Sequence, residues 1–164
     1  MQSIRYVLII SFALTYACNG YAGDKSALTW MSFNDGLANA KKINKKVLVD
    51  VYTDWCGWCK KMDKETYGDG GIRAYLNKHY IVVKLDAESS SKVNYRGETY
   101  TQQDLAGAFG VTGYPSIIFL QPNGEPITVY PGYADAEKFK GVLSFIAEDH
   151  YKTTKFQDYL KSKR

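Results

Sequence analysis

A continuous apolar run leads directly into two closely spaced cysteines, and this arrangement restricts the possible folds and functions more than any other feature of the chain. The run covers residues 47–52, is broken only by Asp50, and has the β-branched content of a strand that is covered on both faces. Cys56 and Cys59 follow it at a Cys-x-x-Cys spacing that fits the first turn of a helix. A disulfide across so short a loop removes little entropy from the unfolded chain and contributes little stability. We therefore interpret the pair as a dithiol redox site.

The remaining patterns predict one α/β domain. Apolar residues make up 45% of the 164 residues and charged residues 23%, which excludes disordered and fibrous classes. Strands are expected at residues 28–31, 47–52, 80–85, 116–120 and 127–130. Helices are expected from a cap at Asn34 to residue 43, at 59–67, 72–78 and 104–109, and after a cap at Asp135. The polar residues 88–103 are interpreted as a surface loop or an insertion.

The first residues have the pattern of a secretory signal peptide. Arg5 precedes an apolar run over residues 6–17 that is short for a membrane span, and small residues flank Tyr21 as signal peptidase requires. We expect cleavage after Ala22, so that the chain is exported to the periplasm. A retained N-terminal anchor helix is the alternative.

This cleavage divides the chain into a signal peptide (1–22), a domain (23–150) and an amphipathic C-terminal tail (151–164) that we expect to pack on the domain. Cys18 introduces a second alternative, because the sequence before it loosely resembles a bacterial lipobox. Thr15 departs from that pattern, which usually has Leu three residues before the cysteine. Cys18 is therefore either a lipid tether or discarded with the signal.

Cleavage after Ala22 leaves Cys56 and Cys59 as the only cysteines of the mature chain. An exported chain with a single pair has no disulfide framework, so chemistry explains the pair better than stability does. The formal charge is +4, to which residues 1–22 contribute only Arg5, and the lysines are dispersed among acids. Nucleic acid is therefore not expected as a partner.

The two cysteines should have different roles. Cys56 stands where free N–H groups and the positive end of a helix dipole favour an anion, so its pKa should fall and it should attack the substrate disulfide. Cys59 lies one turn further in, should be less exposed, and should resolve the mixed disulfide.

Asp50 is a carboxylate within an otherwise apolar strand, where burial raises a pKa. We interpret it as the general base that takes the proton of Cys59. The alternative is an Asp at a strand end that reaches water.

Neither a metal nor another cofactor is expected. Lys60 stands where a c-type haem motif has His, and a single Cys-x-x-Cys offers only two ligands. His79 and His150 have no ligand spacing and are interpreted as surface residues. A copper or zinc carrier remains the alternative from a different functional class.

Three separated motifs resemble the thioredoxin superfamily in order and spacing. They are residues 49–60 (VDVYTDWCGWCK), 83–86 (VKLD) and 113–116 (GYPS). The resemblance covers about residues 45–147. It implies a thioredoxin fold, an α/β structure with a central mixed β-sheet flanked by helices.

The same resemblance implies roles for further residues. Pro115 would be a cis-proline facing the disulfide, and Tyr114 would offer its backbone to a bound substrate strand. Lys84 would pair with the buried Asp50, and Trp55 would pack beside the active site. Among subfamilies, the chain looks most like the C-terminal periplasmic domain of thiol:disulfide interchange protein D, a carrier of reducing equivalents.

One departure concerns the residues between the cysteines. They are Gly57 and Trp58, which differ from the Gly-Pro of thioredoxin and from the His-containing pairs of oxidants and isomerases. Without His, a cation that stabilises the reduced thiolate is missing, so we expect a reductase that acts on protein or peptide disulfides and is supplied by an upstream thiol donor. Trp58 is either a substrate-facing aromatic residue or a covering side chain. An oxidase or isomerase on the same fold is the alternative activity, and a redox-inactive binding module is the non-enzymatic one.

Overall fold

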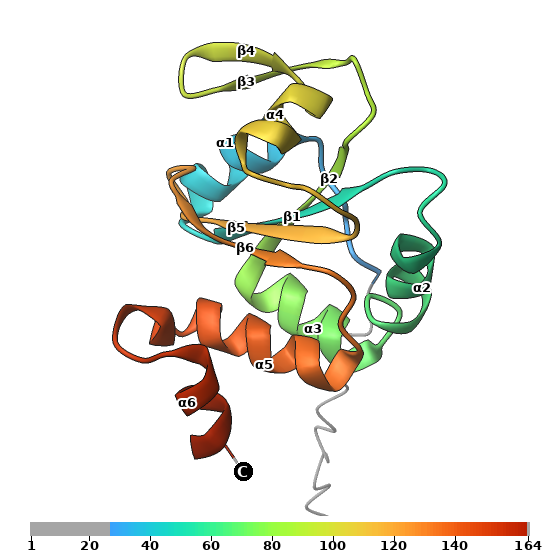
Figure 1. Ribbon diagram of the computed structural model, residues 1–164. Helices are drawn as coiled ribbons and strands as arrows, with labels where there is room; N and C mark the ends of the chain where they lie inside the picture. The colour runs from blue at the N-terminus through green and yellow to red at the C-terminus, as the bar shows by residue number, and fades with distance from the viewer. Residues whose placement is uncertain (1–26, 164) are drawn as a thin grey trace, which may run out of the picture.

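A four-stranded mixed β-sheet forms the centre of the structure, a computed structural model in which residues 27–163 are described (Figure 1). The strand order is β2-β1-β5-β6; β1 is parallel to β2, and the β1–β5 and β5–β6 pairs are antiparallel. The strands are β1 (Lys46–Tyr52), β2 (Tyr80–Asp86), β3 (Lys92–Tyr95), β4 (Glu98–Thr101), β5 (Ser116–Leu120) and β6 (Pro126–Pro131). The helices are α1 (Phe33–Ile43), α2 (Gly57–Glu65), α3 (Gly70–His79), α4 (Gln102–Ala108), α5 (Ala136–Ala147), the 3-10 helix η1 (His150–Lys152) and α6 (Phe156–Ser162).

The two faces of the sheet are buried by different helices, as Figure 1 shows. Successive residues of β1 point to opposite faces. Leu48 packs in the core beneath α3 and α5, and Val47 and Val49 pack in the core beneath α1 and α4. This confirms that the apolar run is an interior strand covered on both faces.

The expected helices are present with shifted ends, and one expected cap was wrong. Ser32, not Asn34, is the N-cap of α1, and its side chain accepts the N–H of Asp35. Asn34 instead exchanges two hydrogen bonds with the backbone of Asn94 on β3. Sequence alone pointed to Asn34 because both residues are good caps. Asp135 caps α5 as predicted.

Two segments differ from the sequence-based expectations. Residues 28–31 do not form a strand; only Met31 pairs with the sheet, through a bridge to Val83. Residues 88–103 are not a plain loop, because they contain the β3–β4 hairpin and the start of α4. The turn of this hairpin uses Arg96 and Gly97, both with positive φ.

Helix α1 approaches the sheet closely at Gly36. A Cβ atom at this position would lie 2.2 Å from Cγ2 of Val83, well inside van der Waals contact. The absence of a side chain therefore sets the distance between α1 and β2.

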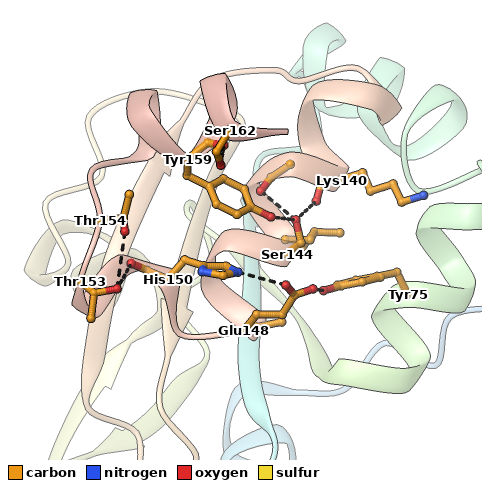
Figure 2. A network of polar contacts seen from close by, with 12 residues as sticks. Tyr75, Lys140, Ser144, Glu148, His150, Thr153, Thr154, Tyr159 and Ser162 are labelled. Carbon is orange, nitrogen blue, oxygen red and sulfur yellow. Dashed lines mark hydrogen bonds and ion pairs between the residues drawn. The ribbon is translucent and has the colours of Figure 1, made fainter. Parts of the chain in front are cut away.

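The C-terminal tail packs on α5, as expected. Phe156 and Tyr159 contact the ring of Phe145, with centroids 5.1 and 5.3 Å away. The Tyr159 hydroxyl lies 2.7 Å from Oγ of Ser144 (Figure 2). Glu148 accepts a hydrogen bond from Tyr75 and pairs with His150 in the same network.

The expected signal peptide, its cleavage site after Ala22 and the lipid-tether candidate Cys18 lie outside the described residues. Within residues 27–163, no helix combines the length and the apolar character that crossing a membrane requires.

Candidate active site

The cysteine pair lies at the junction of β1 and α2. Cys56 is the N-cap of α2, and its Sγ accepts the backbone N–H of Cys59 at 3.1 Å. The two sulfurs are bonded in a disulfide, with the Cα atoms 5.3 Å apart. The predicted position of Cys56 at the start of a helix is thus confirmed, and the structure is that of the oxidised site.

Exposure does not separate the two cysteines as expected. Cys56 is 4% exposed and Cys59 3%, so both sulfurs belong to buried residues. The difference between the sulfurs is instead one of position: Cys56 Sγ receives an N–H from the first turn of α2. Such a contact favours the thiolate.

One exposed indole flanks the disulfide on the side of β5. Trp55 is 66% exposed, and its Nε1 donates to Oε1 of Glu88 at 2.9 Å. Its ring stands edge-on to Tyr114, with 6.0 Å between centroids. Tyr114 precedes the buried Pro115, and the bond between them is cis, as the resemblance implied. The GYPS segment is therefore adjacent to the cysteine pair.

The other exposed indole is part of a second cluster. Trp58 is 58% exposed and packs on Tyr133, with 5.3 Å between ring centroids. Nζ of Lys61 lies 5.0 Å from the Trp58 ring and 5.1 Å from the Tyr133 ring. Tyr133 also donates to Oε2 of Glu65. Gly57, between the cysteines, is the exposed first residue of α2 and has open space around it.

Asp50 and Lys84 form an ion pair on neighbouring strands. They are direct partners in the parallel register of β1 and β2, and Lys84 Nζ lies 2.5 Å from Oδ2 of Asp50. The same ammonium lies 2.6 Å from Oδ1 of Asp63 on α2. The pairing of Asp50 with Lys84 is confirmed, and Asp63 is an unpredicted third member.

Burial dominates the electrostatics of this pair. It raises the pKa of Asp50, and the charge and hydrogen bond of Lys84 offset only part of the increase. For Lys84, burial lowers the pKa, but Asp50 and Asp63 together outweigh it, so the pKa is raised and the ammonium keeps its charge. A carboxyl with a raised pKa beside a fixed cation has the properties of a general base.

Several residues of the site were missed by the sequence reasoning. Asp63 and Lys61 lie on the helix after the cysteines, so helical spacing was the available signal. Glu88 and Tyr133 come from loops that only the tertiary structure brings to the disulfide. Among the described residues, no group of three or more His, Cys, Asp or Glu side chains is arranged to hold a metal ion.

Comparison with known proteins identifies the family. The sequence profile of the thioredoxin-like domain matches residues 33–147, which is most of the chain. The chain belongs to the thioredoxin-like domain family. Membership in this family accounts for the mixed sheet, the cysteine pair at the start of α2 and the cis-proline segment.

Relatives of this thioredoxin-like domain carry redox names. Thiol:disulfide interchange protein DsbD of Actinobacillus pleuropneumoniae is 31% identical over 61% of the chain and 16% of its own length. Disulfide bond reductase DsbH of Chlamydia pneumoniae is 27% identical over 61% of the chain and 60% of its own length. The chain thus spans less than two thirds of either relative.

The same fold occurs in a solved thioredoxin-fold protein from Helicobacter pylori. That structure has a TM-score of 0.65, is 23% identical, and is matched over 87% of this chain and 95% of its own. At this identity the likeness supports the fold alone.

Proposed function

We propose that the chain is an exported, periplasmic thiol:disulfide oxidoreductase that reduces protein disulfides. The observation that carries the proposal is the position of Cys56, whose Sγ is bonded to Cys59 and accepts its N–H at the start of α2. A sulfur held in this way is a stabilised leaving group in the disulfide and a stabilised thiolate in the dithiol.

The reaction follows from the two positions. In the reduced protein, the Cys56 thiolate attacks a substrate disulfide and releases one substrate thiolate. Cys59 then attacks Cys56 Sγ, the bond to the second substrate sulfur breaks, and the Cys56–Cys59 disulfide re-forms. Asp50 takes the proton that Cys59 loses. Lys84 holds Asp50 in place and balances its charge.

Substrate binding is assigned to the surface around the disulfide. Trp55 and Trp58 are, with Ile43, the exposed large apolar side chains of the described chain, and they flank the cysteine pair. The backbone of Tyr114, before Pro115, would pair with an extended substrate segment. Exposed aromatic rings beside a reactive group suit an unfolded or flexible peptide better than a small polar disulfide.

The direction of electron flow rests on Gly57 and Trp58. Neither residue supplies a cation that would stabilise the reduced thiolate, which favours a reducing couple over an oxidising one. The name of DsbH, disulfide bond reductase, states such a role for that protein. A donor thiol upstream would return the pair to the dithiol form, and Cys18 would tether the chain to the membrane if it is lipidated.

Two cysteine variants test the reaction. The wild-type protein should reduce insulin with dithiothreitol as donor, and Cys56→Ser should have no activity. Cys59→Ser should accumulate a mixed disulfide with insulin, detectable by mass spectrometry. Trapping through Cys59 in Cys56→Ser instead would reverse the assigned roles.

A redox titration against glutathione tests the direction. We expect a potential well below about −200 mV, in the range of reducing thioredoxin-type couples. A potential well above this value would replace the reductase with an oxidase or isomerase. Intact-mass measurement of the membrane fraction tests both the start of the mature chain after Ala22 and the lipid on Cys18.

A further inference from the structure

Asp50 has one oxygen with a partner and one without. Oδ2 is paired with Lys84, but Oδ1 is buried and has no hydrogen-bond partner. An unpaired buried oxygen costs free energy, and more when it carries charge. Oδ1 is also the oxygen free to take a proton, because Lys84 occupies Oδ2.

A second buried polar atom without a partner belongs to Tyr67. Its ring is fixed between Trp30 and Phe139, which it meets edge-to-face with centroids 5.0 and 5.7 Å away. The backbone N–H of Tyr67 donates to Met62 at the end of α2. Tyr67 is 4% exposed, and its hydroxyl has no hydrogen-bond partner.

The two atoms belong to one cluster around Lys84. Nζ of Lys84 lies 2.5 Å from Asp50 Oδ2 and 5.5 Å from the Tyr67 ring centroid. The rings of Trp30 and Tyr52 lie 4.7 and 5.1 Å from the same Nζ. The two buried polar atoms without partners therefore belong to side chains that both lie against Lys84.

The phenol stays neutral in this environment. Burial raises the pKa of Tyr67 well above its usual range, and the charges of Asp50 and Asp63 raise it further. Tyr67 therefore cannot act as a base, but a neutral hydroxyl can both donate and accept a hydrogen bond.

We propose that Tyr67 is a positioning residue for the Asp50 carboxyl, and that its hydroxyl is the hydrogen-bond partner of Oδ1 during thiol–disulfide exchange. The hydroxyl donates to Oδ1 while Asp50 is ionised. When Cys59 gives its proton to Asp50, the protonated Oδ1 donates to the Tyr67 oxygen instead. One rotation of the hydroxyl thus serves both states of the base, and this role rests on the proposed function.

Other charged and titratable groups also face this cluster. Lys84 comes from β2, Asp63 from α2 and Tyr52 from β1. Arg73 of α3 lines the same surface groove of about 460 Å³ as Tyr67, Trp30 and Lys84. These groups are unchanged in a Tyr67→Phe variant. A change in the titration of Asp50 in that variant therefore reports the loss of the Tyr67 hydroxyl alone.

The test is Tyr67→Phe, which keeps the ring and its two edge-to-face contacts. Tyr80→Phe is the matched control, because Tyr80 is equally buried and its hydroxyl donates to Leu143 at 2.7 Å. In the reduced proteins, the Asp50 carboxyl is titrated by ¹³C NMR, and the rate of the resolving step is measured against pH by single-turnover tryptophan fluorescence.

We expect Tyr67→Phe to raise the titration midpoint of Asp50 by about half to one pH unit, because the ionised carboxylate loses a stronger hydrogen bond than the protonated carboxyl does. The acidic limb of the resolving rate should move by the same amount, and Tyr80→Phe should move neither. The melting temperature should fall in Tyr80→Phe but not in Tyr67→Phe, whose hydroxyl has no partner in the oxidised structure. In an Asp50→Asn background, Tyr67→Phe should have no further effect on the pH profile.

An unchanged Asp50 midpoint in a folded Tyr67→Phe variant would overturn this role while leaving the proposed function intact. A wild-type protein that reduces no disulfide would overturn the proposed function instead. An Asp50→Asn variant with the wild-type pH profile would remove Asp50 as the base and Tyr67 with it.

Discussion

Lys84 Nζ lies 2.5 Å from Oδ2 of Asp50, because the two residues face each other in the parallel register of β1 and β2. The same ammonium lies 2.6 Å from Asp63, so one cation balances two carboxylates. Of the two carboxylates, Asp50 depends more on Lys84 as its counter-ion, since the Asp50 side chain is 3% exposed and that of Asp63 is 47% exposed. The charge of the site therefore depends on a single lysine.

Replacing this lysine should destabilise the protein in a pH-dependent way. Lys84→Met leaves Asp50 buried without its counter-ion, which should lower the free energy of unfolding by about 3 kcal/mol at pH 7. The pKa of Asp50, already raised by burial, should rise further, so the folded state binds the proton more tightly than the unfolded state. The loss should shrink as the pH falls toward the unfolded-state pKa, which urea unfolding at pH 4 and pH 7 measures.

Lys61→Met is the control for this variant, because Lys61 pairs with the exposed Glu65 and lies over two rings at the surface, but has no buried charge as its partner. Its effect should stay within about 0.5 kcal/mol at both pH values. An equal loss in Lys84→Met at pH 4 and pH 7 would show that packing, and not the charge of Asp50, is responsible.

Removing the Asp50 charge should stabilise the protein at pH 7, in contrast to the loss of stability expected for Lys84→Met. Burial is the main cause of the raised pKa, so the contribution of Asp50 to stability is largest below its unfolded-state pKa and declines as the pH rises through the folded-state pKa. Asp50→Asn should therefore raise the free energy of unfolding at pH 7 by about 1–3 kcal/mol. This gain in unfolding free energy should vanish in acid, as urea unfolding of the two proteins at both pH values measures. An Asp50→Asn variant that is less stable than wild type at pH 7 would contradict the prediction.

Trp58 should contribute to the binding of protein substrates. Trp58→Ala removes an exposed ring that packs on Tyr133, so kcat/KM for insulin reduction should fall about tenfold. The rate with a small linear disulfide should change little, because such a substrate has little apolar surface to bury against this ring. Ile43→Ala, which shortens another exposed apolar side chain, is the control and should leave both rates unchanged. Equal losses with both substrates would assign Trp58 to the redox chemistry instead.

The tail should stabilise the domain through a specific hydroxyl pair. Tyr159→Phe removes the 2.7 Å contact with Ser144 (Figure 2), and the free energy of unfolding should fall by about 1 kcal/mol. Ser144→Ala in the same background should add less than it does in the wild type, since the pair is already broken. Strict additivity of the two variants in urea unfolding would show that the hydroxyls do not interact.

Gly36 should not tolerate even a methyl group. Gly36→Ala would place Cβ 2.2 Å from Cγ2 of Val83, so α1 must move away from the sheet. We expect a loss of about 1–3 kcal/mol in unfolding free energy. Val83→Ala in the same background should restore part of the loss, and no recovery would locate the strain elsewhere.

The cysteine pair and the main strands were predictable from sequence because their signals are local. An apolar, β-branched run before Cys56 specifies an interior strand, and the following spacing specifies a helix start. The motif order then implied the thioredoxin fold, the pairing of Asp50 with Lys84 and the cis bond before Pro115, all of which the structure contains.

Other local signals were ambiguous. Ser32 and Asn34 are both suitable helix caps, and only the packing of Asn34 against β3 decided between them. The polar residues 88–103 form a hairpin whose apolar alternation is limited to Val93 and Tyr95 on one short strand, so the sequence resembled a loop.

The sequence by itself determined the redox pair, its position after a buried strand and the class of fold, because each is set by residues close together in the chain. Only the tertiary structure decided what surrounds that pair. Tyr67, in the turn between α2 and α3, and Asp50, on β1, both lie against Lys84 of β2. Tyr133 reaches Trp58 from the loop after β6. Contacts between residues so far apart depend on how whole elements pack, and no spacing within one segment encodes them.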